Sequence, residues 1–218
     1  MSTILTKIQK AFGGTLYSKI VGFVFILGIL PLVIFDKWTI VLAINKTIAC
    51  NMFDSFFIYY TDTALGGTYV LLAIIFLLIS YRKATIIACS GILILIASMI
   101  FKHLLFPGFD RPTAEIPQEN FYHIIEGFRY ARHNSFPSGH TMSAFGLATI
   151  LSFYTSRKTV HILLVIYAVS IAFSRMYLLQ HFYVDVYAGS IIGFIIISIV
   201  IQFQHMFNNI PDLRFRFN

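Results

Sequence analysis

Charged side chains are scarce in this chain of 218 residues, where aspartate, glutamate, lysine and arginine together make up 11%. A soluble domain carries about 25% charged residues, so the composition excludes an ordinary soluble protein. Hydrophobic residues account for 58% of the chain, and the mean hydropathy is +0.80. We therefore predict an all-α, polytopic membrane protein with a single integral-membrane domain over residues 1–218.

Cysteines and acidic residues are also few. The two cysteines, Cys50 and Cys89, fall in different segments, so we expect neither a disulfide nor a cysteine-bound metal. The acidic residues of 106–137 are spread out and interleaved with arginines, which leaves no carboxylate cluster suited to Mg²⁺. The chain is expected to work without a metal ion or any other cofactor.

The formal net charge of +7 raises the question of a nucleic-acid partner. The basic residues do not cluster on one segment but recur at the ends of apolar runs. We therefore expect the partners to be the membrane and its lipids, and no nucleic acid.

Apolar runs of about 20 residues, the length that crosses a bilayer, recur along the chain. We predict a six-transmembrane-helix bundle with spans at roughly 19–35, 64–81, 84–105, 138–155, 159–177 and 184–204. The first run ends without a small-residue cleavage site, so it is expected to stay as a membrane helix. Residues 38–44 are too short to span and are predicted to form an amphipathic helix at the interface, after the first span.

Basic residues flank these spans on alternate sides. One side receives Lys7, Lys10, Lys19, Arg82, Lys83, Arg157, Lys158, Arg214 and Arg216. The other side receives the mixed-charge segments 36–63 and 106–137. The positive-inside rule then predicts cytoplasmic termini in the inner membrane, with 106–137 and 174–185 on the outer, periplasmic face.

Residues 174–185 place a serine, an arginine, a histidine and an aspartate between two apolar runs. His181 and Asp185 are four apart, so on a helix they would share a face, and the carboxylate could hold the imidazole as a nucleophile. Arg175 adds a planar cation suited to phosphate. The alternative is a polar helix end touching water, with His181 and Asp185 as a surface pair.

A second polar cluster covers residues 135–140. Ser135 can cap a helix, Pro137 suits its first turn, and Ser138 and Gly139 would leave backbone N–H groups free for an anion. His140 would stand beside that anion. The alternative is an ordinary helix start with an interfacial histidine.

The third cluster consists of Lys102 and Arg111-Pro112. Ionisable groups in or near a membrane are costly, so their default interpretation is functional. The alternatives are that Lys102 reaches to the interface with its long stem, and that Arg111 is a solvated loop charge.

Together the three clusters resemble the type 2 phosphatidic acid phosphatase family, membrane lipid phosphatases related to vanadium haloperoxidases. That family's signature reads Lys-x6-Arg-Pro, then Pro-Ser-Gly-His, then Ser-Arg-x5-His-x3-Asp. Residues 137–140 and 174–185 match in full, whereas eight residues, 103–110, separate Lys102 from Arg111. We expect the insertion to bulge at Pro107-Gly108. The resemblance covers about residues 64–204, with the motifs in 102–185.

The resemblance implies hydrolysis through a phosphohistidine intermediate. His181 would attack phosphorus, Asp185 would orient it, and His140 would protonate the leaving oxygen and then activate water. The phosphoryl oxygens would be held by Lys102, Arg111, Ser138, Gly139 and Arg175.

The implied substrate is a phosphorylated lipid that reaches the site sideways from the outer leaflet. Lipid A and undecaprenyl pyrophosphate are the first candidates, with phosphatidylglycerophosphate and phosphatidic acid as alternatives. Arg129 and Arg132 could meet a second phosphate or a sugar, or could simply pair with Glu126. Two other classes are a transporter with a polar relay, disfavoured because the matched residues fall at one membrane face, and an inactive lipid-binding relative, disfavoured by the intact histidines.

Overall fold

The computed structural model describes residues 14–210, which form helices, turns and loops without a strand in that range. The helices, with η marking π and 3-10 turns, are α2 (Leu16–Leu27), α3 (Ile29–Ile34), α4 (Thr39–Thr47), α5 (Asn51–Asp62), α6 (Gly66–Leu77), α7 (Tyr81–Met99), η1 (Ile100–Leu105), α8 (Pro112–Glu115), η2 (Gln118–Asn120), α9 (Gly139–Phe153), α10 (Lys158–Tyr177), α11 (Tyr183–Gln202) and η3 (Gln204–Phe207).

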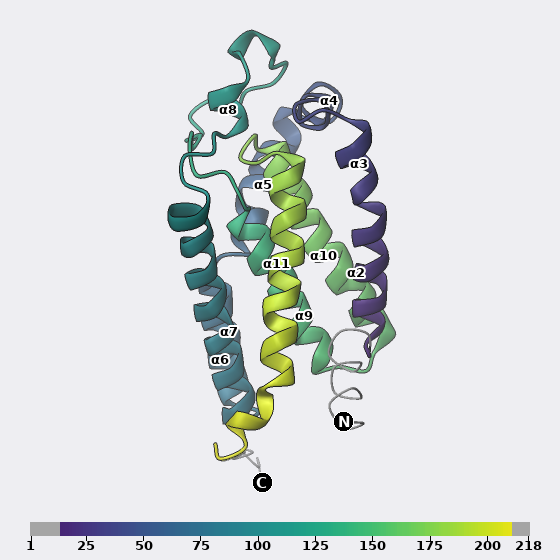
Figure 1. Ribbon diagram of the computed structural model, residues 1–218, viewed down its shortest axis with the longest axis vertical. Coiled ribbons are helices and arrows are strands. Elements are labelled where there is room, and N and C mark those ends of the chain that lie inside the picture. Colours follow the sequence, from purple (N-terminus) through teal and green to yellow (C-terminus); the bar gives the residue numbers. More distant parts are fainter. Residues whose placement is uncertain (1–13, 211–218) are drawn as a thin grey trace.

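Helix α9 lies inside the bundle, packed against α11, α10 and α7 (Figure 1). Most of it is buried, and its sequence is rich in glycine, alanine, serine and threonine, small residues that let helices approach closely in a membrane. The contact with α11 is so close that a Cβ added at Gly193 would overlap the main chain of Met142. The start of α9, with His140, is thereby held within the protein.

Four helical stretches are long and apolar enough to cross a membrane: Leu16–Ile34, Tyr81–Leu105, Lys158–Tyr177 and Tyr183–Gln202. Helices α5 and α6 pass the same test only as a pair, bent by 56°. The all-helical, multi-pass fold is thus confirmed, with four or five candidate spans in the described residues where the sequence predicts six. The predicted span 138–155 is the 15-residue α9, which is short for a crossing on its own.

The predicted span 64–81 also differs from the structure. There α6 has 12 residues, and it is preceded by α5, which the sequence analysis did not predict. Asp62, Thr63 and the pair Gly66-Gly67 lie at the break between the two helices, and polar residues and glycines favour helix ends over helix interiors. One straight span is therefore replaced by two short helices that meet at an angle.

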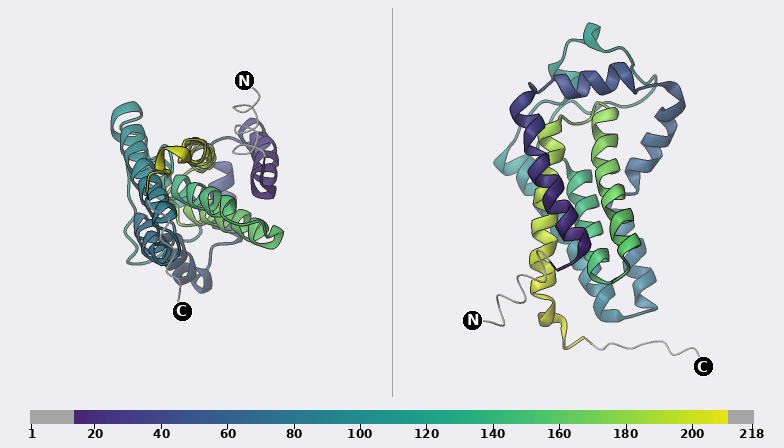
Figure 2. Two further views of the ribbon diagram at one scale, coloured as in Figure 1. Left: turned by 90° about the horizontal axis from the view of Figure 1, so that it is seen from below. Right: turned by 90° about the vertical axis from the view of Figure 1, so that its right-hand side faces the viewer.

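Helix α4 lies across the end of the bundle that carries segment 106–137, here called the loop end (Figure 2). This is the position expected of the predicted amphipathic helix. Asn45 of α4 accepts the N–H groups of Tyr122 and His123, at 2.8 and 3.1 Å, and donates to the His123 carbonyl oxygen at 2.6 Å. His123 Nε2 also lies 2.9 Å from Asp54 of α5. The segment 106–137 is thus fastened to the helices beneath it.

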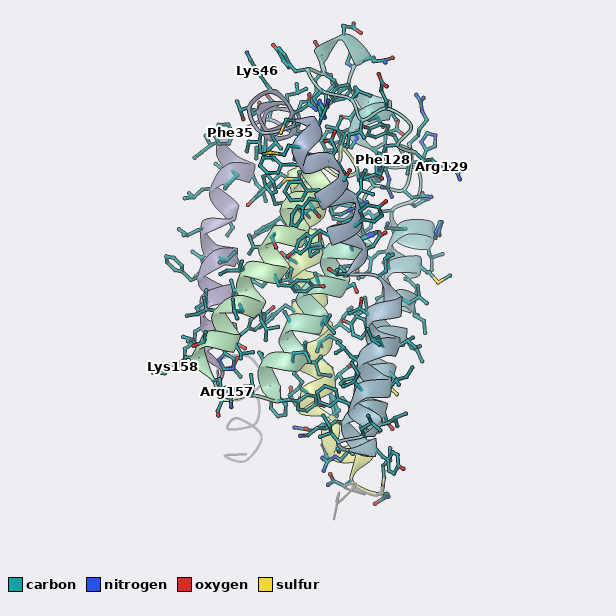
Figure 3. The ribbon with its side chains drawn as sticks, turned by 180° about the vertical axis from the view of Figure 1, so that it is seen from behind. Phe35, Lys46, Phe128, Arg129, Arg157 and Lys158 are labelled. Atoms are coloured by element: carbon teal, nitrogen blue, oxygen red, sulfur yellow. The ribbon has the colours of Figure 1, made fainter. Side chains whose placement is uncertain are left out.

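The basic residues of the described part occupy both ends of the bundle. Arg157 and Lys158 lie at the end opposite the loop end, whereas Lys46 and Arg129 lie at the loop end (Figure 3). Four residues that also support the topology prediction, Lys7, Lys10, Arg214 and Arg216, lie outside the described residues. The start of α2 and the end of α11 lie at the end opposite the loop end, as the prediction requires (Figure 1).

Candidate active site

The turn between α10 and α11 carries His181, and the first turn of α11 carries Asp185. Leu179 has a φ of 53°, a left-handed conformation that costs a non-glycine residue about 1–3 kcal/mol and turns the chain between the helices. The predicted shared helix face is therefore wrong: His181 precedes α11, and Asp185 Oδ2 caps the helix by accepting the Phe182 N–H at 2.9 Å. The turn still places His181 Nδ1 3.5 Å from Asp185 Oδ2.

Ser135 joins this pair from the segment before α9. Its Oγ donates to Asp185 Oδ2 at 2.5 Å and lies 3.4 Å from His181 Nδ1. The prediction that Ser135 caps the helix is wrong, because Ser138 is the N-cap of α9 and Pro137 lies outside the helix. His181 is 1% exposed and Asp185 is 2% exposed, which excludes a surface pair. Since Nδ1 faces Ser135 and Asp185, Nε2 is the ring nitrogen left for a substrate.

The start of α9 packs directly against α7 and η1. A Cβ at Gly139 would lie 2.8 Å from Ser98 Oγ and 3.7 Å from Lys102 Nζ, so glycine makes room for both. The Ser138 N–H is not free as predicted, because it donates to the Asp185 main-chain oxygen at 3.0 Å. The N–H groups of Gly139 and His140 belong to the first turn, which has no acceptor within the helix, and they remain available to an anion.

Lys102 lies on η1, a π-helical turn at the end of α7. Such a turn takes up an extra residue within a helix. Gly108 then reverses the chain with a φ of 81°. The eight residues between Lys102 and Arg111 are thus accommodated in two places, of which the predicted bulge at Pro107-Gly108 is one.

A cavity of about 210 Å³ opens beside the start of α9. Its polar lining residues, which define what we call the polar chamber, are Ser98, Lys102, Gly139, His140 and Ser143. The remaining lining is apolar and comes mainly from α6 and α7. The chamber therefore brings together two of the three predicted clusters, through Lys102 and His140.

Arg111 and Arg175 are both buried, with 8% and 6% of their surface exposed. Nη1 of Arg175 donates to Thr61 Oγ1 at 3.1 Å, and its Nε has no hydrogen-bond partner among the described residues. Arg111 is surrounded by acceptors from 133–134 and from Gln180. The burial of Arg111 excludes the alternative interpretation that it is a solvated loop charge.

Burial lowers the pKa of His181 well below its ordinary value, and the positive charges of Arg111, Lys102 and Arg175 lower that pKa further. The three predicted cations therefore all act on the same imidazole. At neutral pH, His181 is uncharged, which is the form in which an imidazole nitrogen can attack phosphorus.

Other residues singled out by the sequence are not part of this arrangement. Arg129 and Arg132 are exposed, and Arg129 lies at the surface of the loop end (Figure 3). Ser174 donates to the main-chain oxygen of Ile171 at 2.7 Å, so it serves the helix. Within residues 14–210, no group of three histidine, cysteine, aspartate or glutamate side chains could hold a metal ion.

Three residues at the site were not predicted to take part: Ser98, Thr61 and Gln180. Thr61 lies far from the motifs in sequence and reaches the site only through packing, whereas Ser98 precedes Lys102 by four residues. Gln180 precedes His181 directly, and a polar residue next to the predicted nucleophile was a usable signal.

The chain was compared with known protein families, curated proteins and solved structures. No curated protein matches it. The crystal structure of LpxE from Aquifex aeolicus is similar, with a TM-score of 0.63 and 25% identity over 78% of this chain and 97% of that one. The first transmembrane PAP2-type phosphatidylglycerolphosphate phosphatase from Bacillus subtilis shares the fold, with a TM-score of 0.55 and 22% identity over 90% and 100%. The PAP2 superfamily matches residues 83–209, more than half of the chain, and the chain therefore belongs to this superfamily of membrane phosphatases.

Proposed function

We propose that the protein hydrolyses the phosphate of a membrane lipid at the outer face of the inner membrane, through a phosphohistidine at His181. The observation that carries the proposal is the surroundings of His181. The imidazole is buried and uncharged, its Nδ1 lies beside Asp185 and Ser135, and three cations lower its pKa. Phosphoryl transfer depends mainly on positioning and on neutralising the phosphoryl oxygens, and these are what the site supplies.

In the first step His181 Nε2 forms a bond to phosphorus while the bond from phosphorus to the lipid oxygen breaks. His140 gives a proton to that oxygen, because an alkoxide is a poor leaving group. Burial and the nearby cations lower the pKa of His140, and the negative charge of the bound phosphate is what would raise it and protonate the imidazole. In the second step His140 takes a proton from water, whose oxygen attacks phosphorus as the N–P bond breaks. Inorganic phosphate leaves, and both histidines return to their starting forms. Lys102, Arg111, Arg175 and the start of α9 stabilise the charge.

A lipid substrate is supported by an apolar groove that joins the polar chamber. The groove has a volume of about 520 Å³ and runs between α6 and α7. It shares Gly66, Tyr69, Gly91 and Leu95 with the lining of the chamber. A molecule with a phosphate in the chamber could therefore lay a hydrocarbon chain between these helices, which fits approach from within the bilayer.

Four lipids are the candidates: lipid A, undecaprenyl pyrophosphate, phosphatidylglycerophosphate and phosphatidic acid. Lipid A and undecaprenyl pyrophosphate come first, as the resemblance of the motifs implies, and the fold shared with a phosphatidylglycerolphosphate phosphatase is compatible with a phosphorylated lipid. Release of inorganic phosphate from each lipid, measured in detergent with wild type and His181→Ala, tests the proposal and ranks the lipids. A transporter or an inactive relative would release no phosphate that depends on His181, and that result would end the proposal.

The groove has its own test, because two neighbouring glycines differ in position. A Cβ at Gly66 or at Gly67 meets no atom within 4 Å, but only Gly66 lines the groove and the chamber. Gly66→Leu should reduce phosphate release from a long-chain lipid at least tenfold while sparing a short soluble phosphate ester. Gly67→Leu is the matched control and should leave both substrates unaffected. Equal effects of the two variants would mean that the groove holds no part of the substrate.

A further inference from the structure

The guanidinium group of Arg111 is held on every side by acceptors of its own chain. Nε donates to the main-chain oxygen of His133 at 3.0 Å, and Nη2 donates to that of Asn134 at 3.4 Å. Nη1 donates to both the main-chain oxygen and Oε1 of Gln180, at 3.2 and 2.7 Å. A guanidinium has five N–H groups, and these four bonds leave one. Arg111 can thus give a phosphoryl group a single hydrogen bond but not a two-pronged contact.

Gln180 supplies two of these four bonds, including the shortest, and it is the only side-chain acceptor among them. It is 4% exposed, and its N–H donates to the Arg175 main-chain oxygen at 3.0 Å after the left-handed turn at Leu179. Its Nε2 is buried without a partner among the described residues. An unpaired buried donor is costly, so packing alone would favour an apolar residue here. The amide must therefore serve through its oxygen, which holds Arg111.

The choice of an amide also bears on charge. A glutamate at this position would offer Arg111 a stronger, charge-assisted bond, but its negative charge would cancel that of the arginine. Burial already lowers the pKa of Arg111, which means that the surroundings disfavour its charged form. A neutral acceptor fixes the cation and leaves its field intact.

We infer that Gln180 is a positioning residue, which fixes Arg111 beside His181 without neutralising it, so that the full charge of the arginine acts on the phosphoryl group. Arg175 has the complementary role, because its buried Nε lacks a partner and can turn to a phosphoryl oxygen. The inference rests on the proposed function, and it adds to that function a residue at one of the unspecified positions of the motif Ser-Arg-x5-His-x3-Asp.

A double-mutant cycle tests the positioning. Gln180→Met keeps the length of the side chain and removes the acceptor. It should lower kcat/KM for lipid phosphate at least tenfold, mainly through kcat. The Arg111→Lys background has no guanidinium for Gln180 to hold. There the same change should lower kcat/KM less than twofold, since the effects of interacting residues are not additive. The matched control is Gln118→Met, at an exposed position in η2, which should leave kcat/KM unchanged in both backgrounds.

Gln180→Glu tests the charge and does not depend on whether the methionine variant folds. Arg111 stays held, so the unfolding midpoint in detergent should not fall. The added charge should weaken inhibition by vanadate at least tenfold. It should also move the acid limb of kcat/KM to higher pH, because His181 then faces one more negative charge beside Arg111, Lys102, Arg175, Asp185 and His140.

Two results would overturn the inference in an active enzyme. One is a loss in Gln180→Met of the same size in both backgrounds, which would make Gln180 a packing residue. The other is Gln180→Glu with wild-type vanadate inhibition and pH profile. A wild type without phosphate release that depends on His181 would instead refute the proposed function itself, and this inference with it.

Discussion

At the scale of single residues, the account depends on the contact between His181 and Asp185. His181→Ala should abolish phosphate release, because the account makes its imidazole the nucleophile and the lowered pKa keeps that imidazole in the uncharged form that attacks phosphorus. Asp185→Asn should lower kcat by about 10³–10⁴-fold, as loss of the orienting carboxylate does in a hydrolase triad. His205→Ala, at an exposed histidine in η3, is the control and should behave as wild type. Substantial turnover by His181→Ala would require another nucleophile.

The lowered pKa of His181 has a consequence for pH dependence. A free histidine takes up a proton at about pH 6.5, but the folded enzyme does so only at lower pH. The loss of kcat/KM caused by protonation of His181 should therefore begin below pH 6.5. The same difference makes the fold less stable as the pH falls below about 6.5, since the unfolded chain then binds a proton that the folded chain does not. If kcat/KM instead began to fall on acidification already above pH 7, and a His140 variant did not show this fall, the titrating group would be His140 and not His181.

Sequence reasoning identified the residue types of the site through motif spacing, yet it missed their supports. Ser135 was interpreted as a helix cap, but it bonds to Asp185, which lies 50 positions later in the chain. Gln180 depends on the left-handed turn at Leu179, and no propensity predicts a leucine in that conformation. Both errors concern contacts made by tertiary packing, which spacing along one segment does not encode.

At the scale of helices, the packing of α9 on α11 should be sensitive to one added methyl group. Gly193→Ala would place a Cβ against the Met142 main chain, and the overpacking should destabilise the protein by about 1–3 kcal/mol. It should also lower phosphate release by shifting His140 relative to His181. Gly22→Ala in α2 is the control, because nothing lies within 4 Å of its Cβ. Unfolding midpoints in detergent compare the two, and equal midpoints would contradict the close contact.

The hydropathy of the sequence located most of the helices but did not predict α5. Its sequence contains Asp54 and Asp62, which interrupt the apolar sequence between the first two predicted spans. Asp54 is in fact paired with His123 and with the hydroxyl of Tyr177, at 2.9 and 2.7 Å. The partners lie 69 and 123 positions away, so the sequence did not indicate that this carboxylate would have hydrogen-bond partners. The sequence did locate α9, at 138–155, but it predicted a full membrane span where the helix has only 15 residues.

At the scale of the whole molecule, the orientation in the membrane is a prediction from the basic residues. Reporter fusions after Lys83 and after Lys158 should report the cytoplasm, and fusions within 113–125 should report the periplasm. Lys83 lies in the first turn of α7 and Lys158 is the first residue of α10. Both helices begin at the end opposite 106–137 (Figure 1). A cytoplasmic signal from a fusion within 113–125 would place the site on the wrong side for a periplasmic lipid phosphatase.

The central claim is that His181 carries the phosphate during turnover, and the most direct test is to trap it there. A nitrophenolate leaves without a proton, so His140→Ala should still complete the first step with an aryl phosphate but lack the base for the second. The measurement is the count of labelled phosphate on the protein after mixing His140→Ala with labelled aryl phosphate, followed by acid and base treatment. The account predicts a burst of phenol and stoichiometric, acid-labile, base-stable label that disappears in His140→Ala/His181→Ala. Absence of label in His140→Ala, or label that persists without His181, would contradict it.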